Sequence, residues 1–232
     1  MASPGDLYEV IAPLLGVSHA TVRAHDLALV RAGLRTTGGR GRSAAKMTSR
    51  DAASLTIVSM ASDSLSDTTS TLDSFAALPT VKRWELVGKN SPIEALADNH
   101  TFLDAFAAIL DAARDNQIDL AEHPKDAIGL RYYFGKQPID IQITLHRPDC
   151  WAIVRFREPG TSEKEHIETR GYSTGKFPPQ SINLKRSFTI DDRTIFALAC
   201  RLDDRELKTQ QELRDEMKKA RIRVGSDARR SS

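Results

Sequence analysis

Apolar residues recur at helical spacing near the start of the chain, in two segments that a glycine separates. In the first segment Asp6 can cap a helix, and the apolar positions that follow are spaced i, i+3, i+4 and i+7. Gly16 can adopt the positive φ of a tight turn, and Ser18 can cap a second helix. Gly33 can end that helix as a left-handed cap, with Leu34 folded back onto the core. The positions expected to face inward are Leu7, Val10, Ile11 and Leu14, then Val22, Leu29 and Val30.

The following segments predict a hairpin and a third helix. Gly38-Gly39 suits a tight hairpin turn flanked by arginines, and residues 38–46 are called the arginine loop below. Thr48 opens a third helix, with Asp51 as the acid of a capping box. The stretch 63–78 is rich in Ser, Thr and Asp but keeps an approximate helical rhythm. It is therefore either a helix that dimerises or a partly ordered connector.

The period of the pattern changes in the second half of the chain. Residues 91–94 combine the signals of a helix start, and a broad apolar stripe predicts a helix over 101–116. From about residue 128 apolar and polar positions alternate, which is typical of half-buried strands. A charged helix is expected over 203–223. The predicted strands of a small antiparallel sheet are 130–134, 139–145, 151–156, 166–169, 182–188 and 194–202.

Positive charge is concentrated in one short part of the chain. Between His19 and Arg50, seven Arg or Lys residues stand against one acid, Asp26, which gives this stretch a net charge of +6. The whole chain carries only +2, so the remaining residues are negative on balance. Charge this concentrated is typical of a protein with a polyanionic partner. The basic residues are Arg23, Arg31, Arg35, Arg40, Arg42, Lys46 and Arg50.

The same stretch resembles a known DNA-binding motif. Residues 17–34, VSHATVRAHDLALVRAGL, are similar to the recognition helix of winged helix-turn-helix proteins, which often open on VS-x-x-TV and close on AGL before a wing. A helix, a recognition helix, a wing and a new helix from Thr48 follow one another as in the MerR-like arrangement. The paired aromatic residues of MerR-like recognition helices are replaced by Ala24 and His25. The resemblance covers residues 6–60 and includes phage-type regulators and the small subunits of DNA-packaging terminases.

The resemblance implies a role for each basic side chain. His19, Ala20, Arg23 and Asp26 are expected to face outward from the recognition helix, whose N-terminal half usually reads bases. Arg23 suits the O6 and N7 acceptors of guanine, and His19 is the next base-reading candidate. Phosphate contacts are expected from the C-terminal end of this helix and from the wing. The candidate DNA-binding residues are Ser18, His19, Arg23, Arg31, Arg35, Arg40, Arg42 and Lys46.

These elements together predict an α+β fold. It combines an N-terminal winged helix-turn-helix, a helical middle and a small C-terminal antiparallel sheet with flanking helices. The expected organisation is a DNA-binding domain over 1–62, a linker or dimerisation helix over 63–90, an α+β domain for oligomerisation or partner binding over 91–224, and a disordered tail over 225–232.

Other chemistry has little support in the sequence. The six histidines lack metal-ligand spacing, and phosphate-loop, dinucleotide and nucleophile-elbow motifs do not occur. We therefore expect no enzyme activity, cofactor or metal. No apolar run suits a signal peptide or a membrane span, and Cys150 and Cys200 are expected to be buried thiols. These features favour a cytoplasmic, nucleoid-associated protein with no membrane partner.

The sequence thus predicts a sequence-specific transcription regulator of bacterial or phage origin that binds double-stranded DNA. A regulator with one short recognition helix usually acts as a homo-oligomer, most often a dimer, on paired half-sites. The C-terminal domain would assemble copies or recruit a protein partner. Two alternatives remain open: a recognition protein similar to the small subunit of a DNA-packaging terminase, and an adaptor whose winged helix-turn-helix binds protein.

Overall fold

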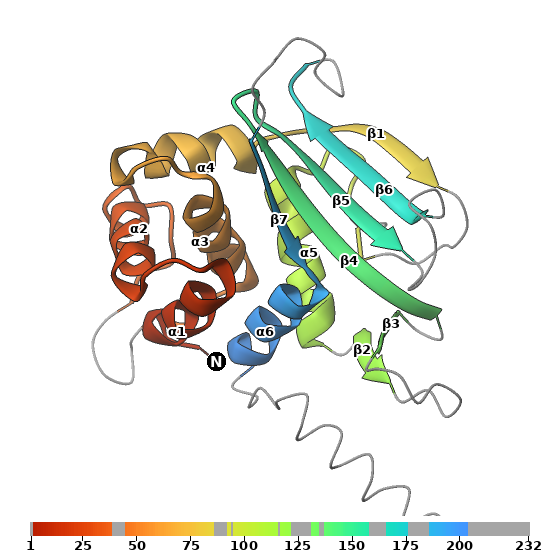
Figure 1. The fold of residues 1–232 in the computed structure, drawn as a ribbon, viewed down its shortest axis with the longest axis horizontal. Helices are drawn as coiled ribbons and strands as arrows, with labels where there is room; N and C mark the ends of the chain where they lie inside the picture. The colour runs from red at the N-terminus through yellow and green to blue at the C-terminus, as the bar shows by residue number, and fades with distance from the viewer. Residues whose placement is uncertain are drawn as a thin grey trace, which may run out of the picture.

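Helices and sheet occupy separate parts of the molecule, with α5 and α6 between the N-terminal helices and the strands (Figure 1). The computed structural model describes residues 2–38, 45–85, 92–93, 95–115, 117–121, 131–134, 137–157, 166–175 and 186–203. The helices in these ranges are α1 (Pro4–Leu15), α2 (His19–Arg31), α3 (Ser49–Ala61), the short 3-10 helix η2 (Leu65–Asp67), α4 (Thr68–Ala76), α5 (Phe102–Arg114) and α6 (Asp192–Leu202).

Local capping signals end α1 and begin α2 where the sequence predicts, but the predicted cap of α1 is wrong: Ser3 is its N-cap, and Asp6 is the acid of the capping box. Gly16 ends α1 with a φ of 67°, and two residues later the Ser18 side chain caps α2 by accepting a hydrogen bond from the Thr21 amide. Gly33, with a φ of 70°, ends α2. The amide of Leu34 donates to the Leu29 carbonyl at 2.9 Å, as in a Schellman motif. The predicted fold-back of Leu34 onto the core is wrong, because this side chain is 39% exposed.

Helix α3 is the centre of the helical part. Nearly all of its residues are buried, and it packs against α1, α2, α4, α5 and α6. A helix buried on every side needs small or apolar residues all round, and the sequence SRDAASLTIVSMA supplies them. Its capping box, formed by Thr48 and Asp51, confirms the predicted start. The stretch 63–78 is also ordered, as η2 and α4, and α4 packs on α2, α3 and α5.

The strands form one antiparallel sheet of order β1-β6-β5-β4-β3-β2, with β7 paired to β4. The long strand β4 organises it, because β5 and β7 pair with opposite edges of this strand. Ile141, Ile143 and Leu145 on β4 are buried in the same core as the inner face of α5. The chain is therefore an α+β protein. The strands are β1 (Thr80–Glu85), β2 (Ile118–Ala121), β3 (Arg131–Phe134), β4 (Gln137–Arg147), β5 (Trp151–Arg157), β6 (His166–Ser173) and β7 (Arg186–Asp191).

Two element predictions are wrong. Residues 194–202, expected as a strand, belong to α6: Asp191 caps the helix by accepting from the Thr194 amide, and residues 195, 198, 199 and 202 share a buried face. A short apolar run fits either period, and here helical packing decides. At the helix start predicted over 91–94, the described residues 92–93 and 95–100 contain turns and no helix. Strands β1 and β2 are not among the predicted elements. The helix predicted over 203–223 lies, apart from Asp203, outside the described residues, as does the tail predicted over 225–232.

Side-chain contacts join the N-terminal helices to the rest of the chain. The Arg201 guanidinium of α6 lies 2.9 Å from the carboxylates of both Asp6 and Glu9 on α1. The Arg147 guanidinium of β4 donates to the carbonyl of Ala61 at the end of α3. The predicted domain boundaries at 62 and 90 stay a prediction, and these contacts show that the helices and the sheet pack as neighbours. Cys150 and Cys200 form no disulfide with each other and are half-buried, so their expected burial is wrong.

The start of α6 gives the stability of the fold a pH dependence. Burial raises the pKa of Asp192 from 3.8 to about 6, and the neighbouring carboxylates of Asp191 and Asp140 add to this shift. Because the pKa is higher in the folded chain, the stabilising contribution is complete below pH 4 and is lost as the pH rises through about 6. We expect Asp192→Asn to raise the free energy of unfolding at pH 8 by about 1–3 kcal/mol.

Urea denaturation of the original chain and of Asp192→Asn at pH 4 and pH 8 checks this expectation. At pH 4 the gain should fall to a small fraction of its value at pH 8, because Asp192 is then protonated in the folded chain and carries no buried charge. An equal gain at both pH values would show that the charge of Asp192 is not its cause.

Candidate nucleic-acid interface

The outer face of α2 carries a regular exposed stripe. His19, Arg23, Leu27 and Arg31 are four residues apart, so they lie above one another on the helix surface, and all four are exposed. The opposite face buries Val22, His25, Asp26 and Leu29 in the core. Of the three residues predicted to face inward, Val22 and Leu29 are confirmed and Val30 is half-buried.

Asp26, the one acid within this basic segment, lies in the core of the helical part. Asp26 is fully buried, so its predicted outward orientation is wrong. Its carboxylate lies 2.6 Å from Nε of Arg35 and accepts a hydrogen bond from Nη2 of the same guanidinium at 2.9 Å. The Tyr8 hydroxyl of α1 also donates to it, and burial followed by this hydrogen bond raises the pKa of Tyr8. The Arg35 side chain, predicted to hold phosphate, is only 9% exposed and belongs to this ion pair.

A histidine holds α2 against the start of α4. The Thr68 hydroxyl donates to the Leu65 carbonyl at 2.8 Å, so it accepts from Nδ1–H of His25 at 2.7 Å. Burial lowers the pKa of His25 and favours the neutral ring, whose Nδ1–H tautomer makes this contact. Sequence analysis missed both Tyr8 and His25 as positioning residues for α2. One signal in the sequence could have indicated the internal ion pair: Asp26 is the only acid among seven basic residues between His19 and Arg50.

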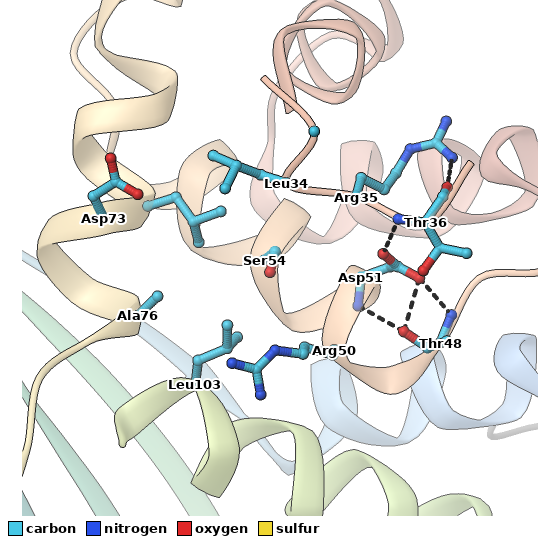
Figure 2. Close-up of a pocket in the computed structure, with 12 residues that line it drawn as sticks. Leu34, Arg35, Thr36, Thr48, Arg50, Asp51, Ser54, Asp73, Ala76 and Leu103 are labelled. Atoms are coloured by element: carbon cyan, nitrogen blue, oxygen red, sulfur yellow. Dashed lines mark hydrogen bonds between the residues drawn. The ribbon is translucent and has the colours of Figure 1, made fainter. Parts of the chain in front are cut away.

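One carboxylate anchors both ends of the segment that carries the arginine loop (Figure 2). Asp51 accepts from the amide of Thr36 at 2.9 Å, before the loop, and from the amide and hydroxyl of Thr48 at 2.9 and 2.7 Å, after it. The Arg35 guanidinium donates to the Thr36 carbonyl at 2.6 Å and so reinforces the first anchor. The arginine loop therefore leaves the helical core from a fixed base.

The loop itself is described only in part. Arg40 and Arg42 lie outside the described residues, and Lys46 is exposed. Met47 is buried, and its amide donates to the Ala2 carbonyl at 3.0 Å. The described residues on either side of the loop, 36–38 and 45–48, contain no strand. The hairpin form of the wing thus remains a prediction.

The start of α2 is the remaining part of the candidate interface. The Ser18 hydroxyl is already engaged as a cap, with contacts to the Thr21 amide and hydroxyl at 3.0 and 2.7 Å. The ring of His19 packs edge-on against Tyr8, with centroids 5.3 Å apart. The N-terminus of a helix carries a partial positive charge and favours anions. These residues therefore present a rigid, electropositive helix start beside the exposed stripe.

Comparisons with known proteins place this chain in no family: family models, curated proteins and solved structures all give no match. In the described part of the chain, no group of His, Cys, Asp and Glu side chains could hold a metal ion. Among the helices that the structure describes, none is long and apolar enough to cross a membrane.

Proposed function

We propose that this protein binds double-stranded DNA, with α2 in the major groove and the arginine loop on the adjacent backbone. The observation that carries the proposal is the orientation of charge in residues 1–62. The four acids of this segment are Asp6, Glu9, Asp26 and Asp51. The first two pair with Arg201, the third pairs internally with Arg35, and the fourth anchors the loop. The outward charge of α2 is therefore carried by arginines.

The dimensions of α2 suit this role. Thirteen residues give a helix about 20 Å long, and the major groove of B-DNA, about 12 Å wide, admits a helix with its side chains. His19 and Arg23 stand in the N-terminal half, where they would reach base edges. Arg31 stands at the far end and would contact phosphate, as would Lys46. Arg35 has a different task, because its pairing with Asp26 fixes α2 and the loop base relative to each other.

The biological role that fits such a surface best is that of a sequence-specific transcription regulator of bacterial or phage type, acting at the nucleoid. One short helix covers few base pairs, so two or more copies would bind paired half-sites. Assembly of the copies, or recruitment of a protein partner, would fall to the sheet and its helices. The two alternatives are a ring-forming DNA-packaging subunit and a protein-binding adaptor. The oligomeric state and the DNA enrichment measured in the following experiment distinguish them from a regulator.

The test is selection of binding sites from a random double-stranded DNA pool with the full chain, followed by fluorescence anisotropy on the enriched site. Arg23→Ala should cost about 1–3 kcal/mol of binding free energy and relax the preference at one base position. Arg31→Ala should weaken binding to all sequences and lower the salt dependence by about one unit. Arg193→Ala is the matched control, because Arg193 is an exposed arginine on α6, outside the proposed interface.

The outcomes separate the alternatives. Enrichment of a paired motif, with a dimer or tetramer by light scattering, supports a regulator. A larger ring on an enriched site would favour a packaging subunit. No enrichment, and equal anisotropy for Arg23→Ala, Arg31→Ala and Arg193→Ala, would overturn DNA binding and leave the adaptor.

A further inference from the structure

The middle of the outward face of α2 is apolar. Leu27 is 41% exposed and does not belong to the hydrophobic core of the described residues. At about 100° per residue, it lies nearly opposite the buried side of the helix, and Ala20 is exposed two turns earlier on the same line. The outward face of a surface helix usually carries polar residues at its centre. A single exposed leucine is common on protein surfaces, so its meaning depends on the residues around it.

Two arginines flank this leucine. Arg23 stands one turn before Leu27 and Arg31 one turn after it, and both are exposed. Helix α2 lies on the side of the molecule away from the sheet, and its described helical neighbours are α1, α3, α4 and η2 (Figure 1). A surface that covers Leu27 must therefore also accommodate two guanidinium groups. An apolar protein surface would leave these cations unpaired, whereas DNA offers them phosphates and guanine acceptors.

The major groove of DNA offers one apolar group to such a leucine. With α2 in the groove, Leu27 faces the base edges between the contacts of Arg23 and Arg31. Every base pair presents hydrogen-bonding groups there, and thymine also exposes its C5-methyl group. A leucine placed over a polar edge would displace water from it without replacing the lost hydrogen bond, which costs free energy. A leucine placed over a thymine methyl group instead gains free energy from apolar burial.

We propose that Leu27 reads a thymine methyl group and so determines part of the sequence preference. This inference rests on the proposed function, because it requires α2 to lie in the major groove. Four residues of an α-helix span about 6 Å, and successive base pairs are about 3.4 Å apart. The thymine is therefore expected about two base pairs from the guanine that Arg23 reads.

Fluorescence anisotropy with deoxyuridine in place of each thymine of the enriched site, one at a time, tests the contact. Deoxyuridine lacks only the methyl group and keeps the base pair. One replacement, about two base pairs from the position whose preference Arg23→Ala relaxes, should weaken binding of the original chain threefold to fivefold, roughly the effect of one buried methyl group. Leu27→Ala should weaken binding to the thymine site at least threefold. It should also make binding insensitive to that replacement, because the contact is already lost.

The matched control is Leu65→Ala. Leu65 is another exposed leucine, and its carbonyl accepts from Thr68, which contacts the buried face of α2 through His25. This variant should keep both the affinity and the deoxyuridine effect, and circular dichroism verifies that all variants are folded.

The outcomes separate this contact from DNA binding itself. An enriched site in which no thymine replacement weakens binding would overturn the contact at Leu27 and leave DNA binding by α2 intact. A methyl effect that persists in Leu27→Ala would also overturn it, because another residue would then read the methyl group. Absence of any enriched site would overturn the proposed function and this contact together, and Leu27 would then belong to a protein-binding surface.

Discussion

Replacing Arg35 with alanine is expected to lower the free energy of unfolding by about 3–5 kcal/mol, because Asp26 would then be a buried charge without a partner. Asp26 is fully buried, and Arg35 supplies both of its charged contacts, at 2.6 and 2.9 Å. The Tyr8 hydroxyl that remains can donate only one hydrogen bond. Urea denaturation followed by circular dichroism measures the loss.

Arg31→Ala is the matched control for this prediction. Arg31 is an exposed arginine four residues before Arg35, and its removal should change stability by less than about 0.5 kcal/mol. A second variant separates the charge from the packing: Asp26→Leu combined with Arg35→Met should recover most of the lost stability, since a buried pair can be replaced by apolar residues of similar volume. A loss below about 1 kcal/mol for Arg35→Ala would contradict an internal role and return Arg35 to the phosphate-binding set.

The helices that the sequence predicted correctly are those whose start and end signals are local. Ser18, Gly33 and the Thr48–Asp51 capping box each act within four residues, and each appears in the structure as expected. The alternation over 139–145 likewise marks β4, whose Ile141, Ile143 and Leu145 are buried, and the partner strand predicted over 151–156 is β5. Local chemistry and periodicity were sufficient for these elements.

The remaining features depend on contacts between distant residues, which periodicity does not reveal. Helical spacing places Asp26 on the same face as Val22 and Leu29, but the spacing does not reveal its partners, Tyr8 on another helix and Arg35 after the glycine cap, which hold a carboxylate in the core. The apolar pattern of residues 194–202 is compatible with either a strand or a helix, and their packing against α5 favours the helix. The anchor between Asp51 and the Thr36 amide also joins segments on either side of a loop. For the candidate interface, the exposed basic residues could therefore be predicted from the sequence, whereas the buried groups that position them could not.

Asp51→Ala is expected to lower the free energy of unfolding by about 2–4 kcal/mol, because the substitution removes the acceptor of a helix cap and of the part-buried hydrogen bond from Thr36. Asp51 is 5% exposed and accepts hydrogen bonds from Thr36 and from two groups of Thr48. Alanine offers no acceptor to any of them. Chemical denaturation of the variant measures the total cost of losing the cap and the loop anchor together.

Asp104→Ala separates these two contributions. Asp104 forms the same capping box with Thr101, at 2.9 and 2.7 Å, but among the described residues it accepts no amide from another segment, and its ion pair with Arg50 is largely exposed. This control should cost about 1 kcal/mol, so the excess cost of Asp51→Ala estimates the anchor at Thr36.

If the arginine loop contacts DNA, Asp51→Ala should also weaken DNA binding, although it removes no positive charge. It should then add little to a variant that already carries Arg40→Ala and Arg42→Ala, because both changes act through the same loop. Full additivity of the two effects on DNA affinity would show that Asp51 acts on α2 and not on the loop.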